Sequence, residues 1–318
     1  MTGARSPELS AAYEACRAIA KREAKNFYYS FRVLPQHKSD AMCVVYAFMR
    51  KADDLADDEG LSIDARRDAM DRWTAAWRAS RTSPTDDPIF IALNDTQERF
   101  AISDELLEQL VAGTTMDLQE TQPGVREMTI RPEGLSAETY QVYESFDALY
   151  DYCYLVASVV GLVCIRIFGY TDKRAELLAE HTGIAFQLTN ILRDIGEDAA
   201  RGRVYLPLDD IKRTGADLES LSLAAKASGV SREVLDLMQL ELQRAQEYYK
   251  AADELIPLVD ADSRSAMQVL VTIYHELLER IASDPSKVFT SRVSVPTYRK
   301  LAVFAKGVIK SISARGRA

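Results

Sequence analysis

One helix face that carries two amides and two carboxylates constrains this chain more than any other feature. The face is formed, at spacings of 3, 4 and 4 residues, by Gln187, Asn190, Asp194 and Asp198. Residues three or four apart share one side of an α-helix, and the apolar residues between them can pack into a core. The lysines that usually offset such acids at i, i+4 are missing from this stripe. Oxygen ligands suit a hard cation, and Mg²⁺ is the usual ion where a phosphate is also held.

A second acidic stretch, residues 50–59, repeats the pattern. Asp53 and Asp57 are four residues apart. Tyr46 and Arg50, which come seven and three residues before Asp53, fall near the same helix face. Alone, an acidic run near a helix end is typical of a solvated surface. Two such stripes, each with an arginine beside its acids, predict facing helices that hold several Mg²⁺ ions bridged by a diphosphate.

Length and composition exclude several classes of protein. A chain of 318 residues with 47% hydrophobic residues can bury a large core. The net charge of −9 disfavours nucleic acid, because no basic stripe would offset phosphate repulsion. An acidic protein can still bind a polyanionic substrate when metal ions lie between them.

Cysteines and apolar runs indicate a cytoplasmic protein. The four cysteines show no C-x-x-C spacing, which predicts buried free thiols in a reducing compartment: Cys16, Cys43, Cys153 and Cys164. The three histidines are scattered along the sequence, so a metal site with histidine ligands is not expected. No secretory leader is expected at the start of the chain. The longest apolar run, Leu155 to Ile165, has 11 residues. It is too short to span a bilayer, so it is expected to form a core helix or the wall of an apolar tunnel.

Helical periodicity dominates, which predicts an all-α protein forming one domain over residues 1–318, with a core at about 9–311. The first helix is expected at 9–31, and Ser39 or Asp40 is expected to cap a second that ends at Gly60. Trp73 and Trp77 are interpreted as core packing. A polar loop is expected around 122–134, followed by helices at 137–169, from 172 through the second acidic stretch, and near 231–255, 262–283 and 296–311. The loop 201–207 is interpreted as a flap over a diphosphate, or as ordinary charge complementarity at a helix end.

Three motifs resemble one family. They are Tyr46–Asp57, Tyr152–Ala157, and Asn190–Asp198 followed by Arg203–Pro207. From about residue 13 to 300 the chain resembles the squalene/phytoene synthases, the head-to-head prenyl transferases. The resemblance implies an isoprenoid synthase fold, with helices around a central apolar cavity, and Mg²⁺ or Mn²⁺ as cofactor.

The resemblance also implies roles for individual residues. The metal ligands would be Asp53, Asp57, Asn190, Asp194 and Asp198, and Tyr152 would act near the reacting carbons together with these acids. The substrates would be bound by Lys25, Asn26, Phe27, Phe31, Tyr46, Arg50, Gln187, Arg193, Arg203, Tyr205, Tyr274 and Arg292. One departure concerns Ser158, where the family often has glycine.

The product is left open between two classes. In the family one prenyl diphosphate ionises, and the double bond of a second attacks its cation to give a cyclopropylcarbinyl diphosphate. Phe31 would shorten the tunnel, because phytoene synthases tend to have a small residue there. The expectation is therefore two farnesyl diphosphates and a C30 product. Two C20 units giving phytoene are the alternative, and the use of NADPH is open.

Other readings of the chain remain as alternatives. A terpene cyclase would carry a different second metal motif, and a non-catalytic helical assembly factor would be expected to lose some metal ligands.

The protein is expected to be a monomer or weak dimer. Its basic amphipathic segment Tyr298 to Arg317 could rest on the inner face of a membrane or form a packed terminal helix.

Overall fold

The structure, a computed structural model, describes residues 5–24, 26–119, 122–131, 136–226 and 229–315, without the side chains of residues 26, 27, 29, 117 and 311–315. Helices dominate, which confirms the predicted all-α class. They are α1 (Pro7–Glu23), α2 (Asn26–Phe31), α3 (Gln36–Ala56), α4 (Ile63–Ser80), α5 (Pro88–Phe100), α6 (Asp104–Thr115), α7 (Phe146–Cys153), α8 (Val159–Phe168), α9 (Arg174–Ala200), α10 (Leu208–Thr214), α11 (Leu218–Ala225), α12 (Arg232–Leu255), α13 (Arg264–Ser283) and α14 (Thr297–Arg315).

Two helix boundaries differ from the sequence prediction. The predicted first helix is divided, because α1 ends at Glu23 and α2 begins at Asn26. The helix that carries the first acidic stretch begins at Gln36, directly after Pro35, and ends at Ala56. Ser39 and Asp40 therefore do not cap it. The Asp40 carboxylate instead accepts hydrogen bonds from Arg5, Arg17 and Gln36, so a tertiary contact takes the place of the cap.

A small sheet was not predicted. Strands β1 (Val125–Ile130) and β2 (Glu138–Tyr143) form an antiparallel pair, and β2 also pairs in parallel with β3 (Arg203–Val204). The expected loop and helix start were therefore wrong here, although residues 132–135 of that loop lie outside the described residues. Tyr140 and Val142 point inward and are buried, which is the period-two pattern of a half-buried strand. The following helix starts only at Phe146, capped by Ser145.

The predicted apolar run lies within one continuous helix. Helix α7, a π-helical turn at Tyr154–Ser158 and α8 together cover Phe146–Phe168. By length and composition alone this 23-residue segment could cross a membrane, since an 18-residue window within it has a mean hydropathy of 1.8. One third of that window is buried, and the segment packs closely against α9 and α6. A Cβ on Gly183 of α9 would lie 2.6 Å from the Ser158 Cα, and one on Gly113 of α6 would lie 2.6 Å from the Leu155 carbonyl oxygen.

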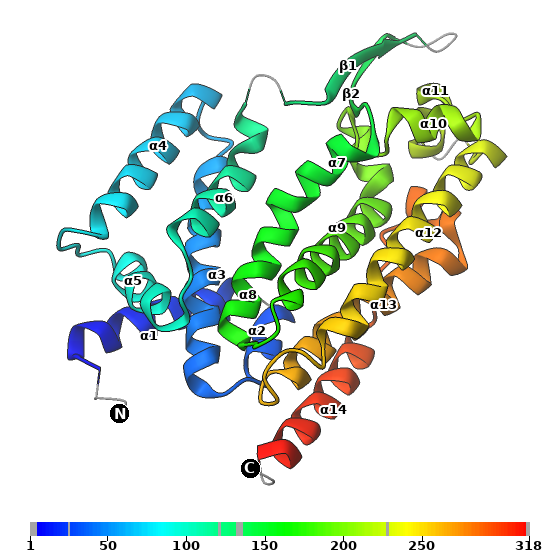
Figure 1. Cartoon of the computed structure of the whole chain (residues 1–318). Helices are drawn as coiled ribbons and strands as arrows, with labels where there is room; N and C mark the ends of the chain where they lie inside the picture. The colour runs from blue at the N-terminus through cyan, green and yellow to red at the C-terminus, as the bar shows by residue number, and fades with distance from the viewer. Residues whose placement is uncertain (1–4, 25, 120–121, 132–135, 227–228, 316–318) are drawn as a thin grey trace.

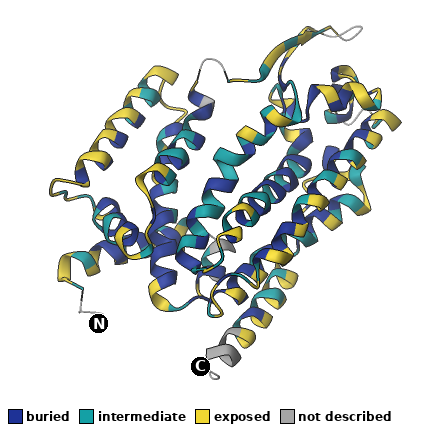
Figure 2. Cartoon of the chain, viewed as in Figure 1, coloured by how far each residue is buried: buried dark blue, intermediate teal, exposed yellow. Residues whose placement is uncertain are grey.

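The helices surround α9, which packs most extensively against α12 and also against α8 and the π-helical turn (Figure 1). Helices α3 and α9 run in the same direction, with α7 and α8 antiparallel between them, so the carboxyl ends of α3 and α9 lie at the same end of the molecule as the sheet. The central helices carry most of the buried residues (Figure 2).

Two groups of buried side chains form the core, one around α1, α3, α5 and α8 and the other around α9 and α12. Phe186 packs against both. Trp73 and Trp77 belong to the first group and pack on Phe48 with ring centroids 4.8 and 5.3 Å away, as predicted. The four cysteines are free thiols, three of them buried and Cys164 partly buried.

Candidate active site

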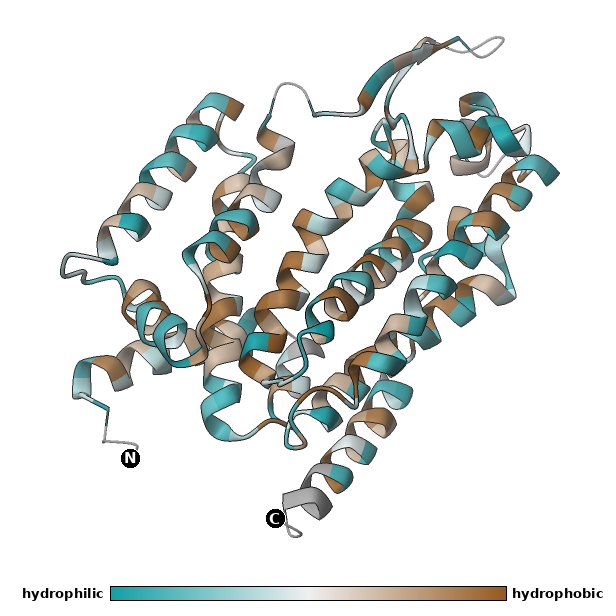
Figure 3. Cartoon of the chain, in the orientation of Figure 1, coloured by the Kyte–Doolittle hydropathy of each residue, from teal (hydrophilic) through white to brown (hydrophobic). Residues whose placement is uncertain are grey.

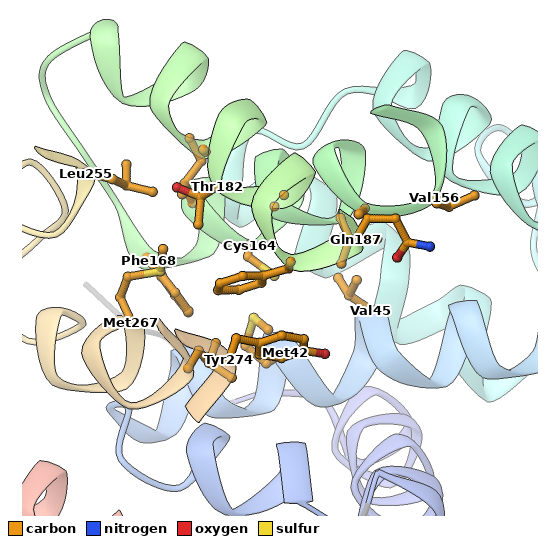
Figure 4. A pocket seen from close by; sticks show the side chains of 18 of the residues that line it. Met42, Val45, Val156, Cys164, Phe168, Thr182, Gln187, Leu255, Met267 and Tyr274 are labelled. Carbon is orange, nitrogen blue, oxygen red and sulfur yellow. The ribbon is translucent and has the colours of Figure 1, made fainter. Parts of the chain in front are cut away.

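An apolar cavity of about 300 Å³ lies between α3, α8, α9 and α13, where the two core groups meet (Figure 4). Helix α8, which is strongly apolar in Figure 3, provides one wall. The lining residues from the predicted apolar run and the turn before it are Val156, Ala157, Val160, Gly161, Cys164 and Ile165. This confirms that the run is a cavity wall. Phe31, 5% exposed, and Met42 close the cavity from the side of α2 and α3.

The polar stripe on α9 enters this cavity. Gln187 and Asn190 both line it, and the Asn190 side-chain amide donates to the Gln187 Oε1 at 3.3 Å. Tyr46 from α3 and Tyr274 from α13 line the same region, and Tyr274 stacks on Phe186 with ring centroids 4.3 Å apart. The cavity is therefore apolar over most of its surface and polar toward one end.

The two predicted acidic pairs lie beyond this polar end. Asp53 is in the last turn of α3, where Asp57 caps the helix, and Asp194 and Asp198 are in the last two turns of α9. Burial, followed by the nearby charge of Asp57, raises the pKa of Asp53 to about 6. Burial, followed by the charge of Asp194, raises the pKa of Asp198 to about 6. Each pair therefore brings two carboxylates close enough to repel one another.

The donor set fits a hard cation. Carboxylate and amide oxygens at the ends of α3 and α9 are the ligands that Mg²⁺ prefers, and the repulsion within each pair would be relieved by a positive ion. Among the described residues no three His, Cys, Asp or Glu side chains are grouped closely enough to hold a metal alone. An ion at either pair would thus need further oxygen ligands, such as Asn190, water or a substrate phosphate.

Arginines surround the second acidic pair. The Arg193 guanidinium donates to both Asp194 oxygens, with 2.7 Å from Nε to Oδ1, and Arg292 lies 3.7 Å from Asp194. Arg193 and Arg292 also line a second pocket of about 310 Å³, here called the basic pocket, with Lys300 and Ser30. Tyr274 borders the basic pocket and the apolar cavity alike, so the two spaces adjoin.

Arg50 lies beside the first acidic pair. It forms an ion pair with Asp54, with 2.6 Å between nitrogen and oxygen. Its Nε atom is buried and has no hydrogen-bond partner within the part of the chain that the structure describes. A buried donor without a partner is costly, so this nitrogen is a candidate ligand contact.

Tyr152 lies in a group of three tyrosines and is not among the described side chains that line the apolar cavity. Its ring centroid is 5.6 Å from that of Tyr143 and 5.1 Å from that of Tyr205. Arg203 and Tyr205 follow the acidic end of α9 directly and border a small pocket with Tyr143. Sequence reasoning missed Tyr143, which is buried directly after Val142 and so falls outside the alternation that Tyr140 and Val142 follow.

Three predicted substrate residues cannot be located. Lys25 lies outside the described residues, and the side chains of Asn26 and Phe27 are likewise not described. Of the other predicted residues, five line the apolar cavity (Phe31, Tyr46, Gln187, Asn190 and Tyr274), and Arg193, Arg292 and again Tyr274 line the basic pocket. Tyr152, Arg203 and Tyr205 belong to the tyrosine group or its small pocket. Arg50 and the two acidic pairs are not among the described lining residues of these spaces.

A family model described as squalene/phytoene synthase matches residues 20–299. The chain belongs to this family. The phytoene synthase of Arthrospira platensis is 32% identical to this chain over 310 residues. The match covers 92% of this chain and 91% of the relative.

Solved structures agree with this family and its fold. The crystal structure of a dehydrosqualene synthase superposes with a TM-score of 0.77 at 27% identity, covering 96% of this chain and 98% of that one. A squalene synthase from Alicyclobacillus acidocaldarius gives a TM-score of 0.74 at 26% identity, with 87% and 95% covered. The protein is thus a prenyl transferase of the head-to-head type with the all-α isoprenoid synthase fold, in a family that uses a divalent metal.

The raised pKa values of Asp53 and Asp198 predict that the metal-free protein loses stability as the pH rises. Unfolded aspartates titrate near pH 3.9, so between about pH 4 and pH 6 the folded protein binds more protons than the unfolded chain. We expect unfolding at pH 5 to cost about 1–3 kcal/mol more than at pH 7.5, after discounting the partly exposed Asp198. Thermal unfolding measured across this pH range, once in EDTA and once in Mg²⁺ without EDTA, gives the pH dependence of stability for each condition.

The matched control is the double variant Asp53→Asn/Asp198→Asn. Glu241, whose pKa burial raises to about 7, adds a pH dependence of the same sign in both proteins. The informative quantity is therefore the difference between wild type and variant. Identical pH profiles for the two would contradict the prediction.

Proposed function

We propose that the protein condenses two farnesyl diphosphates head to head into a C30 product, through a cyclopropylcarbinyl diphosphate. The observation that carries this proposal is the apolar cavity, which is polar at one end, lies next to two acidic pairs and has Phe31 in its wall. The family supports the condensation, and the cavity supports the choice of substrate.

The two acidic pairs would hold the metal ions. Asp53 and Asp57 would bind on the α3 side, and Asn190, Asp194 and Asp198 on the α9 side. When bound, Mg²⁺ (or Mn²⁺) neutralises the charge that develops on the departing diphosphate. Asp194 is paired with Arg193 and Arg292, and a metal ion bound to its carboxylate would release those arginines to contact the diphosphate.

Cationic and hydroxyl side chains would hold the diphosphates. The basic pocket offers Arg193, Arg292 and Lys300 at the border of the cavity. Arg50 would use its buried Nε, which has no partner in the described part of the chain. Arginine suits this role because its planar fork of donors matches phosphate oxygens. Further contacts are proposed from Tyr46, Tyr274, Gln187, Arg203, Tyr205, Lys25 and Asn26.

The cavity would protect the carbocation. Water would quench an allylic cation, so the reacting carbons need a dry space. The walls are mostly aliphatic, and aromatic faces at Phe31, Phe186 and Tyr274 can stabilise positive charge without attacking it. Tyr152 is proposed as a catalytic hydroxyl, held by its contacts with Tyr143 and Tyr205.

The choice of C15 over C20 rests on the size of the cavity. A volume of about 300 Å³ is at the lower end of ligand pockets. The buried ring of Phe31 lies 6.5 Å from that of Tyr46 and limits the space further. The alternative, a phytoene synthase that uses two geranylgeranyl diphosphates, is favoured by curated relatives such as the one from Arthrospira platensis. NADPH would determine whether the C30 product is reduced to squalene.

Incubating the purified protein with C15 or C20 diphosphate, with and without NADPH, tests this proposal. We expect diphosphate release and a C30 lipid from the C15 substrate, measured by mass spectrometry of the extract. A C40 lipid formed only from the C20 substrate would establish the alternative. If neither substrate releases diphosphate, the protein is the non-catalytic assembly factor instead.

The physical state of the protein is part of the proposal. We propose one catalytic domain that acts as a monomer or weak dimer in the cytoplasm. Because substrate and product are lipids, it would exchange them with a membrane surface through peripheral contact.

A further inference from the structure

The last helix presents an apolar face to solvent. On α14 the side chains of Tyr298, Leu301 and Ile309 are 70%, 53% and 65% exposed. Spacings of three and eight residues place them on one side of the helix, and the exposed Ala302 and Ala305 lie between them on that side. At other described positions the exposed large hydrophobic residues do not form such a helix face: Leu61 precedes α4, and Ile63, Leu177 and Leu223 lie on three different helices.

The charge of α14 differs from that of the rest of the protein. Its sequence contains five cations and no acid, in a chain whose net charge is −9. The cations are Arg299, Lys300, Lys306, Lys310 and Arg315. Lys306 is exposed next to the apolar face. Lys310 donates to the neutral Gln268 at 3.1 Å, and no carboxylate pairs with it in the contacts described.

The opposite face of α14 fixes its orientation. Gly307 packs so closely on α13 that an added Cβ would lie 2.5 Å from a Val269 methyl group. Phe304 and Val308 pack against the first core group. Helix α14 lies at the edge of the molecule against α13, as Figure 1 shows. The apolar face with Leu301 and Ile309 therefore points away from the protein.

Helix α13 connects this face to the active site. Its other side lines the apolar cavity through Met267, Leu270 and Tyr274. The exposed face of α14 is thus separated from the cavity by a single helix. A lipid surface resting on α14 would lie close to the space in which the substrate chains are proposed to bind.

We propose that the exposed face of α14 binds an anionic lipid surface. Tyr298, Leu301 and Ile309 enter the boundary between headgroups and acyl chains, and Lys306 and Lys310 contact the lipid phosphates. A second copy docked through the same face would place the cations of two α14 helices against each other, whereas anionic lipid headgroups would neutralise them. The proposal rests on the proposed function only for the lipid nature of the substrate.

Vesicle binding by the full-length protein tests the proposal without substrate. We expect co-sedimentation with vesicles of phosphatidylcholine and phosphatidylglycerol, and little with phosphatidylcholine alone. The variant Leu301→Asp/Ile309→Asp should bind at least about tenfold more weakly, because it replaces the apolar anchors with charges of the wrong sign. Lys306→Gln/Lys310→Gln should also bind more weakly and should lose most of its dependence on salt.

The matched control is Ile63→Asp/Leu177→Asp, which changes side chains of 53% and 56% exposure on α4 and α9. It should bind vesicles like the wild type. Circular dichroism and diphosphate release in detergent verify that each variant is folded and active, so a failure of this proposal is distinct from a failure of the proposed function. Equal binding by the α14 variants and the control would overturn the proposal. A dimer that the α14 variants dissociate would assign the face to a second copy instead.

Discussion

Replacing Asp53 or Asp198 by asparagine is expected to abolish turnover without unfolding the protein. Each carboxylate has a pKa raised to about 6 by burial and a neighbouring acid. Removing its charge therefore relieves repulsion in the metal-free state, and the melting temperature should stay equal or rise. Loss of a metal ligand should lower diphosphate release by about two orders of magnitude or more.

Asp58→Asn provides the matched control for this prediction. Asp58 belongs to the same acidic stretch but is exposed, and its side chain accepts a hydrogen bond from the Gly60 backbone. It should retain activity. Asp194→Asn is a less clean test of stability, because it also removes the ion pair with Arg193. Near-normal turnover by Asp53→Asn or Asp198→Asn would refute the assignment of the metal ligands.

Replacing Phe31 by alanine is expected to change the length of the product. A C20 substrate carries five more carbons than a C15 substrate, and each buried CH₂ is worth about 0.8 kcal/mol if there is room for it. Where there is no room, overpacking costs about 1–3 kcal/mol or more. Phe31→Ala removes most of a ring from the cavity wall, so C40 product from C20 diphosphate should rise at least about tenfold. Mass analysis of lipids from mixed substrates measures the ratio.

Two further variants separate an effect on the cavity from an effect on stability. Phe31→Leu should give an intermediate product ratio. Phe90→Leu alters a buried ring that packs on Trp73 and does not belong to the described cavity lining. It should lower the melting temperature without changing the product. A wild type that already prefers the C20 substrate would contradict the prediction, as would a Phe31→Ala protein that makes only C30 lipid.

The long helices and the polar stripe could be predicted because their signals are local. The spacing of Gln187, Asn190 and Asp194 is a property of one helix, and the structure places the first two in the cavity wall. The apolar run Leu155 to Ile165 was equally easy to predict. A cavity wall requires apolar side chains on only one face of a helix, and the composition of the run supplies them. The cap of α3 was predicted wrongly because Asp40 binds arginines distant in sequence.

The sheet and the tyrosine group depend on contacts between distant segments. Strand β3 has two residues and pairs with β2 some sixty residues earlier. No local pattern indicates such a pairing. Because Tyr143 meets Tyr152 and Tyr205 through this arrangement, its place beside the candidate site could not be foreseen. The break between α1 and α2 was missed because neither proline nor glycine marks it.

The π-helical turn at Tyr154–Ser158 makes the cavity wall sensitive to chain length. A π turn holds one residue more than an α turn, and one residue rotates a helix by about 100°. Deleting a single residue here would restore a regular helix but turn Val160 and Cys164 away from the cavity. Gly183 packs against the Ser158 backbone, so α8 has little space in which to rotate back. Insertions and deletions in this turn should therefore be much rarer among functional variants than exchanges of one aliphatic side chain for another.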